Sequence, residues 1–208
     1  MPTYKHYWRE GSGSLVVDIA LVLCGAPVER IRVDTNAGDH RKPGFLALNP
    51  MAQIPVLVLP DATVLTETAA MVLVLAEAFP QAGLLPPSAG AARATALRWL
   101  MLMATTGYSA ALRAYRPERY SGDASTASCV AVQAAALAES NKIFAILADA
   151  AEGPFLFGAK LTIVDVYLAM LADWHPPALD LPAIRQIHQG VLADPVIAKA
   201  WTRHEQPA

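Results

Sequence analysis

The pattern of apolar residues changes at residue 80, and this change constrains the fold more than any other feature of the sequence. Before it, short β-like runs alternate with helical ones. Expected strands are 3–8, 28–34, 54–59 and 63–65, and expected helices are 15–24 and 67–79. This order predicts a βαβ unit, an irregular stretch and a ββα unit.

After residue 80 the spacing of apolar residues is almost entirely helical. The segment 81–90, QAGLLPPSAG, is rich in Pro and Gly, which indicates a linker. Residues 91–115 and 126–150 carry apolar side chains at helical spacing, and Asp194 followed by Pro195 predicts the start of a last helix. We therefore expect an α/β domain at 1–80, a linker at 81–90 and an all-helical domain at 91–208.

A capping signal lies within the helical half. In GAKLTIVDVYLA (158–169), Thr162 and Asp165 stand three residues apart before an apolar run. This is a capping box with Asp in place of the usual Glu, in which each side chain satisfies the other residue's backbone donor. We interpret it as a folding signal without a chemical role.

Composition excludes several classes of protein. The chain has a formal net charge of −2, so we expect no nucleic-acid partner. Cys24 and Cys129 are far apart and form no CxxC pair, which argues against a disulfide framework and a zinc site, so no metal is expected. The N-terminus has no apolar signal region and no segment has the unbroken length of a membrane span, which predicts a soluble, cytoplasmic protein.

The stretch NPMAQIPVLVLPDATVLTETAA, residues 49–70, contains two unusual elements. Pro55 stands at the second position of an apolar strand-like run, and Glu67 and Thr68 directly precede an apolar helix. Each element alone allows a purely structural reading. Pro55 is compatible with an edge strand or a bulge, and Thr66 with Glu67 is compatible with a helix cap.

Together with the proline-rich linker and the LTIVD motif, this stretch resembles the cytosolic glutathione transferases, including bacterial-type members, over essentially the whole chain. The resemblance implies a thioredoxin-like N-terminal α/β domain, an all-α C-terminal helical domain, glutathione as a substrate without a metal, and a homodimer. In this family the proline that matches Pro55 is cis, and the backbone of Ile54 would pair with the cysteinyl part of glutathione like a neighbouring strand.

Further residues of the glutathione site follow from the same resemblance. Glu67 and Thr68 match an acidic–hydroxyl pair that holds the γ-glutamyl end, where a helix N-terminus favours a carboxylate. His40 lies where some relatives place a histidine against the glycine carboxylate. Lys42 could take that role, and a solvated loop charge is the alternative for both. Gln53 could line the peptide through its side chain.

One hydroxyl group would suffice to activate the thiol of glutathione. Its pKa should be about 8.5, and lowering it by about two units needs roughly 2.7 kcal/mol, which is comparable to one hydrogen bond to a charged group. The sequence offers Tyr7, Ser12 and Ser14 near the first helix. Gly13 stands where some relatives carry a nucleophilic cysteine, which argues against a mixed-disulfide mechanism. We expect Ser12 first and Tyr7 second as the catalytic residue. Tyr7 could instead be an inward aromatic of the strand, and Ser14 a helix N-cap.

The resemblance places the site for an electrophile between the two domains. Tyr108 and Tyr115 are seven residues apart on one helix face, with Arg113 nearby, and Trp174 could also reach the site. A stripe of aromatic residues is also typical of a helical core. These residues are therefore candidates for the electrophile site.

The leading functional hypothesis is conjugation of glutathione to a small hydrophobic electrophile. The alternatives are a glutathione-dependent peroxidase or disulfide reductase, and a non-enzymatic binding or assembly module on the same fold. The chain departs from the family pattern at Glu10, where relatives often have Pro, and at Ala52 and Ala62, where they often have Gly. We expect Ala62 to strain a turn that requires positive φ.

Overall fold

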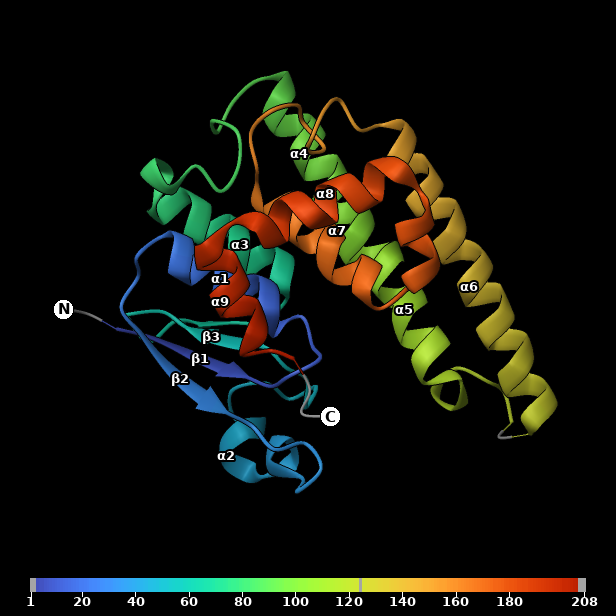
Figure 1. Ribbon diagram of the computed structural model, residues 1–208. Helices are drawn as coiled ribbons and strands as arrows, with labels where there is room; N and C mark the ends of the chain where they lie inside the picture. The colour runs from blue at the N-terminus through green and yellow to red at the C-terminus, as the bar shows by residue number, and fades with distance from the viewer. Residues whose placement is uncertain (1–2, 124, 206–208) are drawn as a thin grey trace. The chain divides into compact units, whose positions relative to one another are not determined.

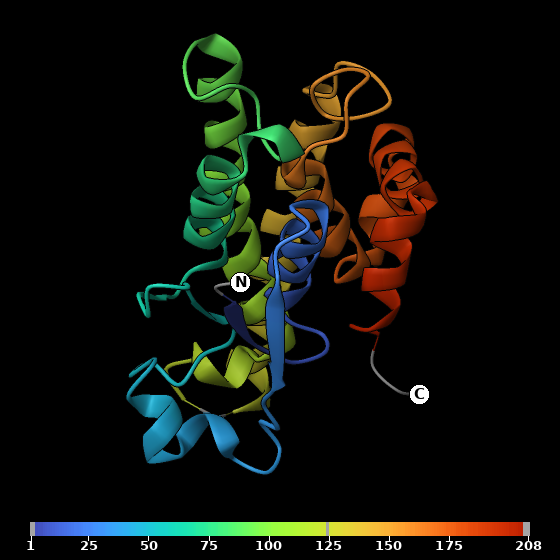
Figure 2. The same cartoon turned by 90° about the vertical axis from the view of Figure 1, so that its left-hand side faces the viewer.

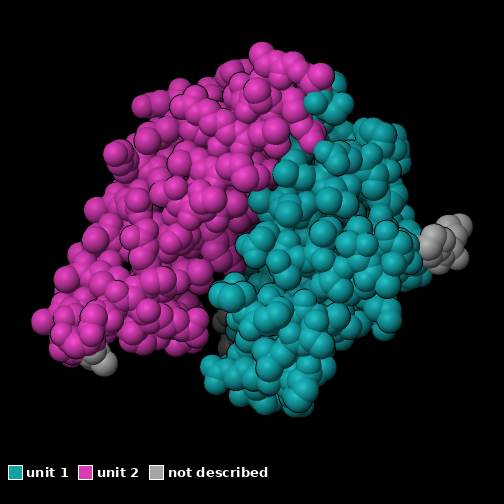
Figure 3. All heavy atoms as spheres, turned by 180° about the vertical axis from the view of Figure 1, so that it is seen from behind, with its two compact units in different colours: residues 1–88, 192–208 teal, residues 89–191 magenta. Residues whose placement is uncertain are grey.

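The computed structural model describes residues 3–123 and 125–205. The chain divides into two compact units, coloured separately in Figure 3: unit 1 comprises 1–88 and 192–208, and unit 2 comprises 89–191. The grouping differs from the expected domains at the C-terminus, where residues 192–208 belong with unit 1. The boundaries expected at 80 and 90 stay predictions.

Unit 1 is built on a mixed sheet of four strands in the order β2-β1-β3-β4. The strands are β1 (Tyr4–Trp8), β2 (Val28–Arg32), β3 (Val56–Val58) and β4 (Val64–Leu65). β1 and β2 are parallel, whereas β1–β3 and β3–β4 are antiparallel, with Tyr7 opposite Val56. The expected strands are confirmed, although only 56–58 of the run 54–59 belongs to β3.

Helices cover both faces of this sheet. The helices of unit 1 are α1 (Ser14–Leu23), α2 (Pro43–Leu46), α3 (Thr68–Ala78) and α9 (Pro195–Thr202). α1, α3 and α9 lie together on one face (Figure 1), and α2 lies on the far side of the strands from α1 (Figure 2). Phe45 of α2 packs against Val33 and Val56, with Tyr7 and Ile54 at the edge of this cluster. The short α2 falls in the stretch that the sequence left irregular.

A buried carboxylate ties α1 to two other parts of unit 1. Asp18 is 1% exposed. Its Oδ1 accepts from Arg30 Nε of β2 at 2.6 Å, and its Oδ2 accepts from Arg203 Nη2 at 2.9 Å and lies 3.2 Å from His204 Nε2. Burial by itself raises the pKa of Asp18, but the hydrogen bonds from His204, Arg203 and Arg30 outweigh it and hold the pKa well below its usual value. His6 of β1 is fully buried nearby, and burial lowers its pKa to about 3, so this imidazole is neutral.

The described part of unit 2 is mostly helical, apart from loops and one isolated β-bridge between Phe155 and Gly158. Its helices are α4 (Ala91–Leu102), α5 (Tyr108–Tyr115), α6 (Thr126–Asp149), α7 (Ile163–Asp173) and α8 (Pro182–Ala193), which ends in unit 1. A π-helical turn, Met103–Gly107, joins α4 to α5. The expected helices over 91–115 and 126–150 are confirmed, and α5 ends at Tyr115, just before Pro117.

α6 requires a correction to one expectation. By length and composition alone, this 24-residue helix could cross a membrane, so the statement that no segment reaches such a length was wrong. One such helix is weak evidence for a membrane protein, because core helices of soluble proteins pass the same test. α6 packs along α5 within unit 2.

The capping signals are confirmed. Asp165 Oδ2 accepts from the backbone N–H of Thr162 at 2.7 Å, and its Oδ1 accepts from Leu156 N–H at 2.7 Å. Asp194 caps α9 by accepting from the N–H groups of Val196 and Ile197. Both caps satisfy backbone donors that a helix start would otherwise leave open.

The expected strain at Ala62 is also found. Ala62 has φ 70° and Ala52 has φ 54°, both in the left-handed region that L-residues with a Cβ avoid. These are two of the positions where relatives often have Gly. The strain is therefore a property of these two turns and not of the sheet.

Replacing Ala62 with Gly should stabilise unit 1 by about 0.5–1 kcal/mol, because Gly adopts positive φ without steric cost. Urea unfolding followed by circular dichroism would measure the change. Ala145→Gly in the exposed face of α6 is the matched control, and it should destabilise by about 1 kcal/mol. A loss of stability in Ala62→Gly would contradict the assigned strain.

Replacing Asp18 with Asn should destabilise the protein by about 2 kcal/mol at about pH 7. This is less than the 3–5 kcal/mol typical of fully buried pairs. The reason is that the side chains of Arg30 and Arg203 remain 29% and 35% exposed.

The cost of Asp18→Asn should depend on pH. The folded-state pKa of Asp18 lies well below its unfolded value, so its contribution is fully present above about pH 4 and is lost progressively as the pH falls from there through the folded-state pKa. Urea unfolding at about pH 7 and about pH 3 would test this. Asp180→Asn, at an exposed position, is the control. An equal destabilisation by Asp18→Asn at both pH values would exclude the charge as its cause.

Candidate functional site

The turn between β1 and α1 carries Ser12, the first catalytic candidate, and Ser14. α1 begins at Ser14, Gly13 is its N-cap, and no side chain caps this end. The alternative that Ser14 is the N-cap was therefore wrong, because Ser14 is already helical. Its buried Oγ accepts from Arg9 N–H at 3.4 Å and lies 2.8 Å from Ser12 Oγ.

The hydroxyl of Ser12 is half-buried at the N-terminal end of α1. Its Oγ lies 2.9 Å from the carbonyl oxygen of Arg9 and 2.8 Å from Ser14 Oγ. A hydroxyl has one hydrogen to donate. Ser12 Oγ donates this hydrogen to the Arg9 carbonyl or to Ser14 Oγ. An anion at the helix start, where the helix dipole favours negative charge, would compete for it.

Tyr7, the second candidate, lies in the apolar cluster on the α2 face of the sheet. Its ring meets the ring of Phe45 edge-on, with the centroids 6.0 Å apart. Ile54 packs on the same cluster, so the structure brings Tyr7 and Ile54 together. This packing is what an inward aromatic of a strand would show, and a catalytic role for Tyr7 stays a prediction.

The peptide bond between Ile54 and Pro55 is cis, as expected. The ladder between β1 and β3 starts at Val56, so Ile54 lies beyond its end. The loop before it is held by Asn49, a buried side chain whose Nδ2 donates to the Gln53 carbonyl at 2.8 Å and whose Oδ1 accepts from Met51 N–H. The side chain of Gln53 is directed to solvent as an exposed residue.

Glu67 and Thr68 form the start of α3. Glu67 is the N-cap residue, with φ 65° and ψ 107°, and its side chain makes no capping hydrogen bond. The plain capping role considered for Glu67 is therefore not observed. Thr68 Oγ1 donates to the Gly13 carbonyl at 3.5 Å, which places the start of α3 next to the start of α1. Backbone donors of the first turns of two helices thus lie close together, an arrangement that favours anions.

His40 is half-buried in the 3-10 turn Asp39–Arg41. Lys42, the alternative at this position, forms an ion pair with Asp39 at 2.6 Å. Its ammonium group is therefore already engaged within the loop. The role of His40 stays a prediction.

The structure separates the candidates of the electrophile site in unit 2. The rings of Tyr108 and Trp174 are in edge contact, with centroids 5.3 Å apart. Tyr115 is 72% exposed and lies under the guanidinium of Arg116. Arg113 forms an ion pair with Glu139 of α6, so its charge serves the packing of α5 on α6. Tyr108 and Trp174 are the two candidates that the structure brings together.

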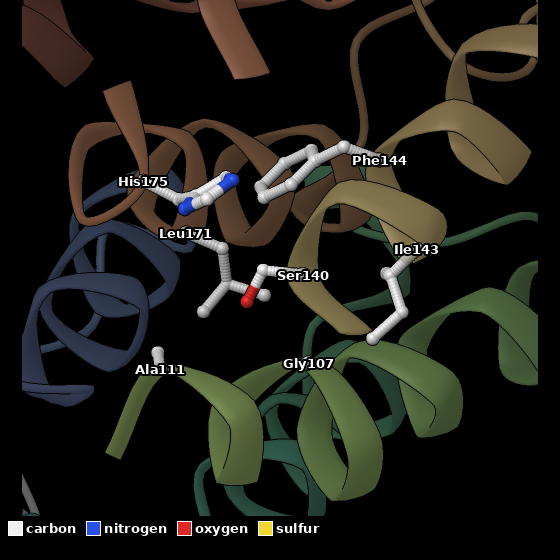
Figure 4. Close-up of a pocket in the computed structure, with 7 residues that line it drawn as sticks. All are labelled: Gly107, Ala111, Ser140, Ile143, Phe144, Leu171 and His175. Carbon is white, nitrogen blue, oxygen red and sulfur yellow. The ribbon is translucent and has the colours of Figure 1, made fainter. Parts of the chain in front are cut away.

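Unit 2 also contains a small cavity beside its π-helical turn, shown in Figure 4. Gly107, Ser140 and Leu171 line it, and its roof is the ring of His175 stacked on Phe144. The cavity measures about 10 Å³, which is the space of about one water molecule. It is too small for a substrate. In the described part of the chain, no cluster of three or more His, Cys, Asp or Glu residues could hold a metal ion.

Comparison with known proteins assigns the chain to a family. Residues 14–78 match the family model of the glutathione S-transferase N-terminal domain. The uncharacterized GST-like protein YncG of Escherichia coli (strain K12) is 31% identical over 176 residues, covering 83% of this chain and 82% of that protein. The chain belongs to the glutathione S-transferase family. Glutathione S-transferase GstA of Escherichia coli O157:H7 is 28% identical over 179 residues, covering 82% of this chain and 81% of that one.

Solved structures agree with this membership. A glutathione transferase homolog from Sulfitobacter, with bound glutathione, is 26% identical and has a TM-score of 0.88 over 99% of this chain and 100% of that one. A glutathione transferase from Methylococcus capsulatus is 27% identical, with a TM-score of 0.80 over 97% of this chain and 98% of that one. This member of the glutathione S-transferase family thus has the expected thioredoxin-like α/β unit and helical unit.

Two residues that support the site were not singled out from the sequence of this transferase-family chain. Asn49 holds the loop before Ile54, and the Asn-Pro dipeptide at 49–50 was an available signal because Asn favours such turns. The backbone of Arg9 contacts both serines of the first turn. A backbone contact of this kind has no signature in the sequence.

Proposed function

We propose that this chain is a glutathione transferase that conjugates the thiolate of glutathione to a small hydrophobic electrophile. One observation carries the proposal: the contact of Thr68 Oγ1 with the Gly13 carbonyl joins the start of α3 to the turn that holds Ser12. A group that recognises a carboxylate is thereby placed beside a hydroxyl that can stabilise a thiolate. Glutathione has both a carboxylate and a thiol.

Each end of the ligand has a partner of suitable chemistry in unit 1. The first-turn N–H groups of α3 donate to the γ-glutamyl carboxylate, and Glu67 accepts from the ammonium group. The Thr68 hydroxyl turns its one hydrogen from the Gly13 carbonyl, which lies 3.5 Å away, to the same carboxylate. The backbone of Ile54 pairs with the cysteinyl residue, since it lies just beyond the β1–β3 ladder. Gln53 and His40 would contact the remaining part of the peptide.

Ser12 turns its hydrogen from the Arg9 carbonyl or Ser14 Oγ to the thiolate, while the backbone N–H of Ser14 donates to Ser12 Oγ and keeps it oriented. One charge-assisted hydrogen bond, together with the N-terminal dipole of α1, is worth about 2–3 kcal/mol and lowers the thiol pKa by about two units. The thiolate then forms a carbon–sulfur bond with the electrophile. The leaving group departs with its electron pair, and the thiol proton has already passed to solvent.

A second candidate function is isomerisation. The maleylacetoacetate isomerase of Rhizobium meliloti (strain 1021) is 45% identical over 80 residues, which cover 38% of this chain and 37% of that protein. A thiolate that adds to a conjugated double bond can leave again, so the same site would regenerate glutathione after each turnover. Loss of free thiol during turnover distinguishes conjugation from isomerisation.

Other parts of the proposal rest on the composition of the chain and, for the dimer, on the family resemblance. We expect a cytoplasmic homodimer without a nucleic-acid or membrane partner. No contact in the described residues favours a peroxidase, a disulfide reductase or an assembly module over conjugation.

Calorimetric titration with reduced glutathione tests the binding site. The unmodified protein should bind saturably, and Glu67→Ala with Thr68→Ala should weaken binding at least about tenfold, because a hydrogen bond to a charged group is worth about 1.5–3 kcal/mol. Thr68→Ser is the matched control, since it keeps the hydroxyl and should bind within about threefold. Absence of binding to the unmodified protein at millimolar glutathione would overturn the proposal.

Kinetics with an activated aryl halide identify the hydroxyl that activates the thiol. Ser12→Ala should lower kcat about 100-fold at neutral pH, equivalent to about 2.7 kcal/mol of thiolate stabilisation. Its pH–rate profile should shift upward by about two units. Tyr7→Phe, which keeps the ring against Phe45, should change kcat less than about threefold. The reverse pattern would assign the role to Tyr7.

A further inference from the structure

The residues that follow α9 lie against the turn that carries Ser12. The carbonyl oxygen of His204 accepts from Gly11 N–H at 3.2 Å. Its imidazole packs on the ring of Trp8, with the centroids 4.8 Å apart, and its Nε2 lies 3.2 Å from Asp18 Oδ2. His204 therefore touches the end of β1, the turn and α1 at once, and it is 6% exposed.

Arg203 strengthens this attachment. Its Nη2 and Nε both reach Asp18 Oδ2, at 2.9 and 3.2 Å, from a position 185 residues further along the chain. Asp18 stands one helical turn after Ser14, so the attachment holds α1 close to its first turn. Arg30 binds the other carboxylate oxygen from β2. Asp18 thus fixes the C-terminal segment to the helix start and to the sheet.

Hydrogen bonds within the turn join Arg9, Ser12 and Ser14, and the contact on Gly11 N–H comes from His204. Ser12 stands between Gly11, which has φ 59°, and Gly13. Glycine loses more conformational freedom on folding than any other residue. Within the turn, Ser12 Oγ contacts only Arg9 and Ser14 among the described residues. From outside the turn, Thr68 contacts the Gly13 carbonyl, and the C-terminal segment holds Gly11 through its N–H. The contact on Gly11 therefore restricts the flexible residue that directly precedes Ser12.

We propose that Arg203 and His204 are positioning residues for the Ser12 hydroxyl: by holding Gly11 and Asp18 they keep the turn in the conformation that aims this hydroxyl at the thiol of glutathione. The inference rests on the proposed function. The two residues act through the turn and touch no reacting atom. Loss of their contacts should leave glutathione bound but less ionised.

The test compares three altered chains with the full chain. Arg203→Ala with His204→Ala removes both side chains, and a chain ending after Thr202 also removes the carbonyl that binds Gly11. Arg203→Lys with His204→Gln keeps a cation and a donor and should rescue function. Lys199→Ala, at an exposed position of α9, is the control.

Two readouts distinguish positioning of the Ser12 hydroxyl from a role in fold stability alone. Both are measured below the melting temperature of each chain. The first readout is the pKa of the bound glutathione thiol, measured by the ultraviolet absorbance of the thiolate. In the double alanine variant this pKa should rise by about one unit, and kcat/KM should therefore fall about tenfold at neutral pH. The KM for glutathione should change less than about threefold, because the binding groups at Ile54 and α3 are intact. The rescue pair and Lys199→Ala should match the full chain.

The second readout needs no ligand. Amide hydrogen exchange at Gly11 should speed up at least about tenfold in the chain ending after Thr202, while exchange in β1 stays slow. A lower melting temperature with an unchanged thiol pKa would overturn the proposal and leave a structural role only. If the full chain binds no glutathione, the proposed function fails. The rate of amide exchange at Gly11 then tests by itself whether the C-terminal segment holds the turn. An unchanged rate in the chain ending after Thr202 would overturn the proposal.

Discussion

One buried carboxylate organises unit 1. Asp18 accepts hydrogen bonds from β2 and from the segment after α9, and it fixes α1 against both. Burying a charge is costly unless it is fully paired, and here two arginines and a histidine supply the pairing. The position of α1 in turn sets where its first turn meets the first turn of α3. The proposed glutathione site thus lies at the N-terminal end of a helix whose buried side is held by an ion-pair cluster.

The chemistry of the site comes mainly from backbone. The starts of α1 and α3 supply N–H donors, and Ile54 lies beyond the β1–β3 ladder, before the cis bond to Pro55. Only a few side chains add to this: a hydroxyl on each helix start and the carboxylate of Glu67. Such a site tolerates extensive change elsewhere in the sequence, which agrees with a fold match of 0.88 in TM-score at 26% identity.

Local signals allowed much of the fold to be predicted, and non-local contacts explain what was missed. The strands, the long helices and the capping box of Thr162 follow from periodicity and short motifs, as does the strain at Ala62. The partners of Asp18 lie up to 186 residues away, and no pattern in a single sequence reveals such pairs. The role assigned to Ser14 failed for a smaller reason: the helix begins one residue earlier than a serine cap requires, and Gly13 takes that position.

The separation between Asp18 and its C-terminal partners also sets an order of events during synthesis. A ribosome adds about 5–20 residues per second, so the 185 residues between Asp18 and Arg203 take about 10–40 s to emerge. Throughout that interval unit 2 is being made, and α1 has Arg30 as its partner from β2. Unit 1 therefore begins synthesis before unit 2 but is completed after it, when Arg203 and His204 reach Asp18.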